Sequence, residues 1–419
     1  MRALIVSSLA LVAAMSGAAH AQAPADAEVL KTYGDIALAG YEDSLTTAQA
    51  LDQAVAAFLA APTEDNLSAA REAWKASRIP YQQTEAFRFG NAIVDEWEGR
   101  VNAWPLDEGL IDYVDAAYGT ESDENGLYTA NVIANPKITI DGVEVDATSI
   151  TPDFLQNTLQ EAGGIEANVA TGYHAIEFLL WGQDLNGTGP GAGKRPASDY
   201  DTANCTNGNC DRRGAYLKAA TELLVSDIEE MVGNWADGGP ARLALADTGI
   251  STILTGMGSL SFGELAGERM KLGLLLHDPE EEHDCFSDNT YISHLYDAVG
   301  VRNVYLGRYH RTDGTDLAGP SVSEIIAAKD PALDKEIRDL LDDTIKKMDA
   351  MKRRGETVEA YDQMIGEGNT EGNAVVQAAI DGLIAQTRGI ERAVALLQLG
   401  DKVTIEQSDS LTNPEAVFE

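Results

Sequence analysis

Apolar residues recur three and four positions apart along most of the chain, which is the spacing of amphipathic helices. Such spacing runs through residues 27–61. Thr63, followed by two acidic residues, predicts the N-cap of a second helix that continues to Phe89 and bends at Pro80. Further segments with helical spacing follow residue 212: 216–235, 241–276, 291–309, 322–351 and 374–399. Strand-like alternation is almost absent, so the pattern predicts an all-α protein.

The helical pattern is interrupted in the first half of the chain. Residues 100–152 are irregular, and a small hairpin is predicted over 137–145 around an Asp-Gly pair. Helical spacing returns over 154–181, with an interruption at a Gly-Gly pair. The next stretch, 182–209, is rich in Gly and Pro, which predicts a long surface connection and a domain boundary.

The surface connection divides the chain into two predicted helical-bundle domains, because 419 residues exceed what one hydrophobic core usually organises. We expect an N-terminal bundle over 22–200, a C-terminal bundle over 201–400 and a tail over 401–419. An aromatic-Gly-acidic segment closes a helix both at 85–90 and at 262–268. A pseudo-duplication of the bundle is therefore a further hypothesis.

Residues 1–21 predict a secretory signal peptide. Arg2 gives a basic start, residues 3–15 are apolar apart from two serines, and a small-x-small triplet at 19–21 fits a cleavage site before Gln22. The apolar run is too short for a retained membrane anchor, and no cysteine follows it that could carry a lipid. We therefore expect a soluble periplasmic protein without membrane insertion. The competing interpretation, a buried N-terminal helix, lacks a helix cap.

Acidic residues dominate the charge: 68 Asp and Glu stand against 30 Lys and Arg, for a formal net charge of −38. Such a surface repels nucleic acid and anionic lipid, so neither is expected as a partner. A solvated surface explains the surplus, and attraction of cations is a second consequence. Cys205 and Cys210 are close enough to form a disulfide in an oxidising compartment, which leaves Cys285 unpaired and argues against a cysteine-only metal cage.

The sharpest local feature is the hexapeptide 172–177, Gly-Tyr-His-Ala-Ile-Glu, inside an apolar helical stretch. The i, i+3 spacing puts His174 and Glu177 on one helix face, close enough to share a metal ion or a proton. The alternative is a purely structural, hydrogen-bonded pair, because a buried histidine beside a glutamate is usually satisfied locally.

Three other segments carry candidate chemistry. Glu85 lies in an aromatic-rich helix, where a carboxylate needs a partner. Residues 256–270 pack small residues around two glutamates and an arginine, so another backbone or a ligand can come close. Residues 282–290 concentrate potential ligands just before a helix, although Asp288 and Asn289 there also fit ordinary capping.

Together, the Gly-x-His-x-x-Glu motif, the Arg-x-Pro-Tyr segment before Glu85 and the segment 282–290 resemble the imelysin-like family, with the iron-regulated, insulin-cleaving-protease-like branch most similar. The resemblance covers most of the chain. It implies two helical bundles with a site near their junction, in an envelope protein linked to iron acquisition. It also implies a metal site of His174 and Glu177, with Glu85 and Asp107 as companions.

Hydrolysis has to be weighed, because imelysins have been classed as metallopeptidases. A zinc hydrolase needs about three protein ligands, an open position and a general base. The helical motif His-Glu-x-x-His is absent, and so is His-x-x-Glu-His, because Phe178 follows Glu177. An enzyme is therefore not the favoured interpretation.

A metal-binding role asks for fewer groups. An imidazole with two or three carboxylates suits iron, and zinc is the second choice. We expect His174, Glu177 and Glu85 to bind a transition metal for iron uptake or handling in the periplasm, with the free ion or chelated iron as the ligand. A third hypothesis is a non-catalytic envelope scaffold that binds a receptor or chelated iron.

Overall fold

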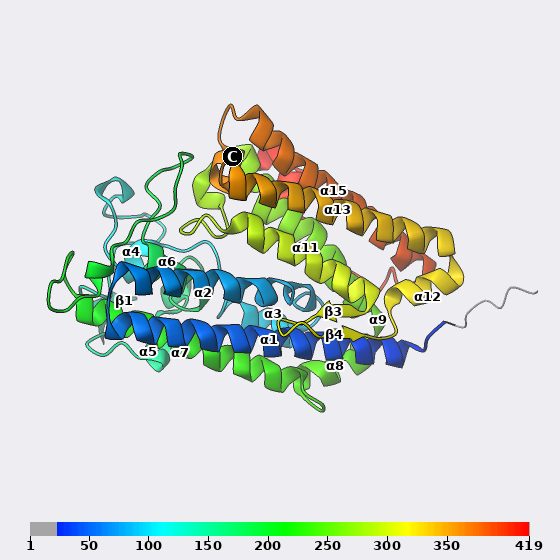
Figure 1. The fold of residues 1–419 in the computed structure, drawn as a ribbon, viewed down its shortest axis with the longest axis horizontal. Helices are drawn as coiled ribbons and strands as arrows, with labels where there is room; N and C mark the ends of the chain where they lie inside the picture. The colour runs from blue at the N-terminus through cyan, green and yellow to red at the C-terminus, as the bar shows by residue number, and fades with distance from the viewer. Residues whose placement is uncertain (1–22, 419) are drawn as a thin grey trace, which may run out of the picture.

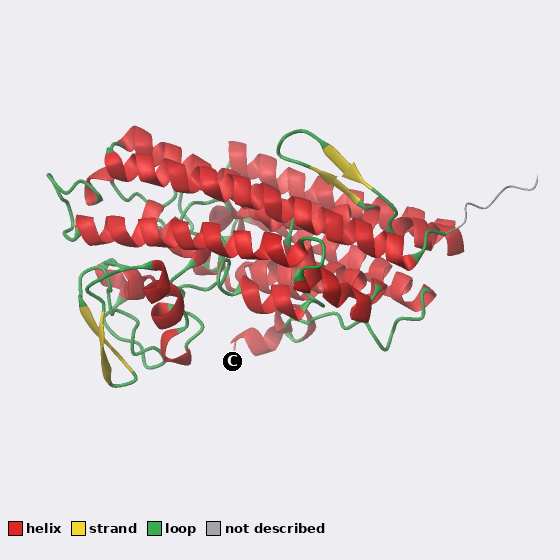
Figure 2. Ribbon diagram, turned by 90° about the horizontal axis from the view of Figure 1, so that it is seen from below, coloured by secondary structure: helices red, strands yellow, loops and turns green. Residues whose placement is uncertain are grey.

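The computed structural model describes residues 23–418, so the predicted signal peptide lies outside the described residues. Helices dominate the described chain, and its strands form two short antiparallel hairpins at the periphery (Figures 1 and 2). The all-α prediction is confirmed. Within residues 23–418, no helix is long and apolar enough to cross a membrane.

Three long helices form one side of the molecule: α1 (Asp26–Ala60), α2 (Glu64–Gln82) and α7 (Cys210–Trp235). α1 packs along the other two, and the short α6 (Gly172–Trp181) contacts both α2 and α7 (Figure 1). The predicted cap of α2 is confirmed, because the Thr63 hydroxyl accepts a hydrogen bond from the Asn66 backbone N–H at 3.3 Å. α7 starts after residue 200, so this group contains chain from both predicted domains.

The other side of the molecule is built mainly by α9 (Ile250–Ser259), the π-helical segment η6 (Leu260–Lys271), α11 (Thr290–Leu306), α13 (Pro331–Thr357) and α15 (Thr370–Leu396). α15 packs on α13 and η6, and α13 packs on α11. α11 also contacts α2, which joins the two sides (Figure 1). One hydrophobic core runs through both groups of helices.

The second predicted helix ends earlier than its pattern indicates. α2 stops at Gln82, two residues after Pro80, and the 3-10 turn η1 (Glu85–Phe87) follows. Pro80 has no backbone N–H to bond the preceding turn, so the last turn of α2 is weakened. Glu85 therefore lies outside the helix that was predicted to contain it.

The prediction of a helix over 154–181 is wrong for its middle part, residues 160–171. α5 (Pro152–Phe154) and the π-helical turn η3 (Leu155–Leu159) start it, irregular chain follows, and α6 begins only at residue 172. The glycines at 163 and 164 both have φ of +72°, a left-handed conformation that ends a helix. The predicted interruption is real and longer than expected.

The predicted hairpin is confirmed. β1 (Lys137–Ile140) pairs antiparallel with β2 (Val143–Asp146), and the Asp-Gly pair forms the turn between them. A second hairpin, β3 (Arg308–His310) with β4 (Asp316–Ala318), replaces the end of the helix predicted to reach residue 309. Cys205 and Cys210 form a disulfide, and Cys285 is free and buried.

The C-terminal tail packs on the small residues of η6. A Cβ at Gly263 would lie 2.9 Å from Glu406, and one at Gly267 would lie 2.2 Å from the Ser408 side chain. The small residues of this segment therefore allow a close approach, as predicted, and the group that approaches them is the C-terminal tail of the same chain. The remaining elements are α3 (Ala92–Glu98), η2 (Ala116–Tyr118), α4 (Glu108–Ile111), η4 (Ala162–Gly164), η5 (Ala197–Asp199), α8 (Pro240–Thr248), α10 (Leu272–Leu276), η7 (Pro279–Glu281), α12 (Val322–Lys329), α14 (Tyr361–Ile365), α16 (Asp409–Thr412) and η8 (Pro414–Phe418).

Candidate metal centre

The start of α6 is fixed by a backbone contact with the loop after α3. Gly172 has φ of +76°, and a Cβ on it would lie 2.3 Å from the Val101 carbonyl oxygen. The same oxygen accepts a hydrogen bond from the Tyr173 N–H at 2.7 Å. Only glycine tolerates both the positive φ and the close approach of the Val101 carbonyl group. The contact of Gly172 and Tyr173 with Val101 therefore sets the direction in which the side chain of His174 points into the molecule.

The structure brings His174 and Glu177 together on one face of α6. His174 Nδ1 lies 3.1 Å from Glu177 Oε2, and both side chains are fully buried. The other carboxylate oxygen, Oε1, accepts hydrogen bonds from Ser287, at 3.0 Å from its backbone N–H and at 2.6 Å from its hydroxyl. Glu177 thus ties the histidine to the loop 282–290.

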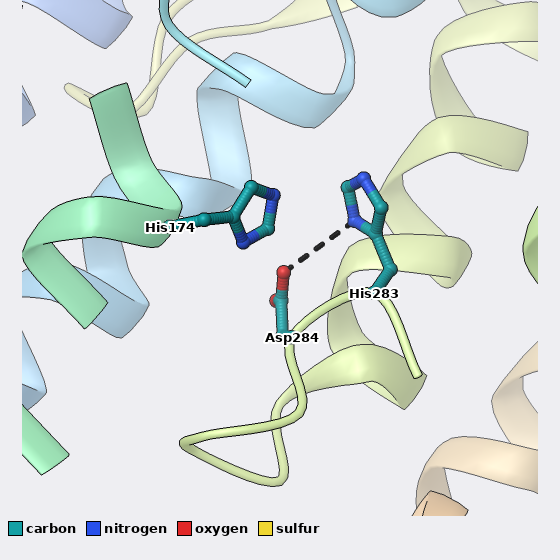
Figure 3. A group of neighbouring side chains, drawn as sticks. All are labelled: His174, His283 and Asp284. Carbon is teal, nitrogen blue, oxygen red and sulfur yellow. Dashed lines mark ion pairs between the residues drawn. The ribbon is translucent and has the colours of Figure 1, made fainter. Parts of the chain in front are cut away.

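That loop places His283 and Asp284 beside His174 (Figure 3). The three side chains are buried, each offers one ligand atom, and these atoms lie within 4.8 Å of one another. The two imidazole centroids are 4.7 Å apart, and His283 Nδ1 lies 3.5 Å from Asp284 Oδ1. Ligands bound at about 2.0–2.2 Å can be no more than about 4.4 Å apart. Small side-chain rotations are therefore enough for all three to share an ion.

Asp284 is held by hydrogen bonds at both oxygens. Arg78 of α2, which is fully buried, donates from Nη2 to Oδ1 at 2.9 Å. Asn289 donates from Nδ2 to Oδ2 at 3.0 Å, and the Ser293 hydroxyl donates to the same oxygen. Burial opposes ionisation of Asp284, but Arg78 outweighs it and holds the pKa of that carboxyl well below its usual range. The carboxylate is therefore charged and fixed.

The two histidines are in the form that binds metal ions. Burial lowers the pKa of His174 and that of His283 well below the usual range, so both rings are neutral at pH 7. His174 Nε2 is buried and has no hydrogen-bond partner among the described residues. When Nδ1 carries the ring proton and donates a hydrogen bond to Glu177, Nε2 presents a free lone pair. This unpartnered nitrogen fits a metal ligand.

An acidic cavity of about 560 Å³ leads to the cluster. His283 and Trp104 form part of its wall, and the Trp104 ring lies 5.2 Å from the His174 ring between centroids. Eight acidic residues line the cavity, against two arginines. Glu96, Glu161 and Glu281 are among them and come from separate parts of the sequence. The lining concentrates cations near His283.

Glu85 and Asp107 lie outside the cluster of His174, His283 and Asp284. Arg269 donates from Nη2 to Glu85 Oε2 at 2.7 Å, and both side chains are buried. Asp107 accepts a hydrogen bond from Asn125 Nδ2 at 2.5 Å in the insertion between α2 and α6. Within the described chain, neither belongs to the group that could share an ion with His174. A role for them in metal binding stays a prediction from the resemblance.

Sequence reasoning did not single out His283, Asp284 and Arg78 as members of the site. The segment 282–290 was recognised as rich in potential ligands, but capping explained it equally well. No local periodicity connects it with residue 174. Asn289 occupies the N-cap position of α11 without a side-chain cap bond, and its Nδ2 donates a hydrogen bond to Asp284. The His-Asp pair at 283–284, in the loop that leads to α11, was the available signal.

Known proteins resemble this chain in sequence and in fold. The family model Imelysin matches residues 37–390. Iron-regulated protein A of Synechococcus elongatus is 38% identical over 76 residues, which are 18% of this chain and 21% of that protein. The crystal structure of a protein from Parabacteroides distasonis, described as an iron-regulated protein A precursor, has a TM-score of 0.62 at 18% identity and covers 90% of this chain and 96% of that one. This structural likeness shows a shared fold. Because the family model matches most of the sequence, the chain belongs to the imelysin family.

Proposed function

We propose that the protein binds a transition metal ion, iron in the first place, through His174, His283 and Asp284, and that it serves iron uptake or handling. The observation that carries the proposal is the buried, unpartnered Nε2 of His174 beside a second neutral histidine and a charged aspartate. Two histidines and one carboxylate with open positions are the ligand set typical of non-haem Fe(II), and zinc also accepts it.

Glu177 acts on the metal through His174. Its carboxylate lies against Nδ1, and a hydrogen bond from this nitrogen to a carboxylate orients a metal-binding histidine and raises the basicity of its other nitrogen. Both oxygens of Glu177 have hydrogen-bond partners without a metal, since Ser287 donates to the oxygen that does not face His174. Glu177 is therefore a positioning residue in this proposal.

Arg78 limits the affinity of the site for a metal ion. Its guanidinium lies 2.9 Å from the carboxylate that would bind the ion, so its charge opposes a second cation there. The acidic cavity wall compensates part of this repulsion. Moderate affinity suits a protein that takes up an ion and passes it on, whereas a permanent cofactor needs a tighter site.

The predicted signal peptide and the relatives support the proposed cellular role. The predicted signal peptide supports a periplasmic location. The relatives described as iron-regulated protein A and as its precursor support a link to iron. A cavity of about 560 Å³ is within the range of small-molecule sites, so a chelated form of iron is a second ligand to test.

A hydrolytic role has one observation in its favour. His174, His283 and Asp284 supply the three protein ligands that a catalytic zinc site uses. The nearby carboxylate that could act as general base, Glu177, is engaged by His174 and Ser287. Cleavage of an unstructured polypeptide by zinc-loaded protein, lost in His283→Gln, would favour the peptidase function over metal handling.

Anaerobic titration of the chelator-treated protein with Fe(II) tests the proposal. We expect one ion per chain, and His283→Gln to weaken binding at least about tenfold because one of three ligands is lost. His310→Gln is the matched control, since His310 is exposed and its imidazole pairs with Asp316, away from the cluster of His174, His283 and Asp284. Equal Fe(II) affinity in the wild type and His283→Gln would contradict the assignment.

A further inference from the structure

A second group of potential ligands lies on the other side of the loop 282–290. Glu282, Asp288 and Asp362 each offer a carboxylate oxygen, and these atoms lie within 4.8 Å of one another. Glu282 and Asp288 belong to the loop, and Asp362 belongs to α14. The group therefore joins two parts of the chain that are some 75 positions apart in sequence.

The carboxylates of this group lack the partners that buried charges need. Glu282 and Asp362 are each only 1% exposed. Among the described residues, neither oxygen of Asp362 has a hydrogen-bond partner, and Glu282 Oε1 and Asp288 Oδ1 have none either. Three unpaired carboxylates at this separation repel one another in a poorly solvated place. A positively charged partner would offset this repulsion.

Basic side chains do not balance the negative charge of these three carboxylates. Lys75 and Lys194 favour ionisation of Asp288 from a distance, but no ion pair joins a basic residue to the three carboxylates in the described part of the chain. Asp184 adds further negative charge nearby. Burial raises the pKa of Asp288 and of Asp362 to about 7, and a bound cation would remove this penalty on ionisation.

We propose that Glu282, Asp288 and Asp362 bind a hard divalent cation of the calcium type. The ligand atoms are all oxygens, the class that calcium prefers, and oxygens bound at about 2.3–2.6 Å can be up to about 5 Å apart. Asp288 is only partly buried, so water can complete the coordination shell. No histidine or cysteine belongs to this group, which distinguishes it from the His174 centre.

The cation would hold in place the loop that carries the first site. Glu282 directly precedes His283, and Asp288 lies four residues after Asp284. An ion shared with Asp362 therefore fixes both ends of the segment that presents His283 and Asp284 to α6. The binding itself is independent of the proposed iron function, so either one can fail alone.

Calorimetric titration of the chelator-treated full mature chain with Ca²⁺ tests this inference. We expect one saturable site per chain and a loss of at least about tenfold in affinity in Asp362→Asn, because ligand charge sets calcium affinity. Glu281→Gln is the matched control: it removes the same charge from the neighbouring residue, which lines the acidic cavity instead. The double variant His174→Ala/His283→Ala should bind Ca²⁺ as the wild type does.

Thermal unfolding separates loss of the site from loss of the fold. Without cation, Asp362→Asn should melt at the wild-type temperature or above it, because the substitution removes an unpartnered buried charge. With Ca²⁺, the wild type should gain stability and the variant should not. If Asp362→Asn unfolds early, Asp288→Asn replaces it in the same titration. Absence of saturable Ca²⁺ binding to the wild type, or wild-type affinity in a folded variant, would overturn the proposal.

Discussion

At the scale of single residues, the centre depends on which nitrogen of His174 carries the proton. The 3.1 Å contact between Nδ1 and Glu177 favours the tautomer with a free Nε2, and burial keeps the ring neutral. The hexapeptide alone predicted that these two side chains share a helix face. It could not predict His283 or Asp284, since they approach through tertiary structure and no local pattern connects them.

Replacing Glu177 with glutamine tests this role. In Glu177→Gln the amide N–H₂ can donate to Nδ1, which moves the ring proton to Nε2 and blocks the metal-binding nitrogen. We expect Fe(II) affinity to fall about 10- to 100-fold, with a shift in the ¹⁵N resonances of His174 that reports the changed tautomer. Glu166→Gln, on the exposed cavity wall, should change neither. Unaltered resonances and affinity in Glu177→Gln would show that Glu177 does not position the ring.

At the scale of elements, backbone contacts decide where α6 begins and therefore where its side chains point. The capping residue Thr63 and the hairpin turn of β1 and β2 follow local rules, so both could be predicted from the sequence. The late start of α6 could not be predicted, because it depends on the packing of Gly172 against the Val101 backbone.

A pair of glycine substitutions measures that contact. Gly172→Ala should cost about 3 kcal/mol or more in the free energy of unfolding, since it combines a left-handed backbone with a clash against Val101. Gly164→Ala has a similar φ of +72° with open space around it, so only about 1–2 kcal/mol is expected. Chemical denaturation of both variants gives the difference. Equal losses would mean that the Val101 contact does not fix the start of α6.

At the scale of the whole molecule, two groups of helices share one core, and the candidate centre lies where α2 and α6 meet the loop before α11. The resemblance predicted a site near such a junction, but local sequence patterns do not reveal how the two groups of helices pack on each other. The acidic surplus is general along the chain, whereas the structure gathers part of it into one cavity.

Glu98, a buried acid in the wall of this cavity, makes the free energy of unfolding depend on pH. Burial raises the pKa of Glu98 to about 7, above the value of about 4.3 expected in the unfolded chain. The folded state therefore holds the proton more tightly, so this stabilisation is present at low pH and is lost as the pH rises through about 7. Between pH 5 and pH 8, with chelator present, the wild type should lose at least about 1 kcal/mol relative to Glu98→Gln. Parallel unfolding free energies over this range would contradict the assignment.

The most direct test of the central claim is the metal content of the protein expressed from Gln22 onward and purified without chelators, measured by elemental analysis beside His174→Ala/His283→Ala. Both proteins are first checked for equal helicity. The account predicts close to one transition metal ion per wild-type chain, with iron the main element after reloading with Fe(II), and almost none in the double variant. Equal metal content in the two proteins, or no metal in either one after reloading, would contradict it.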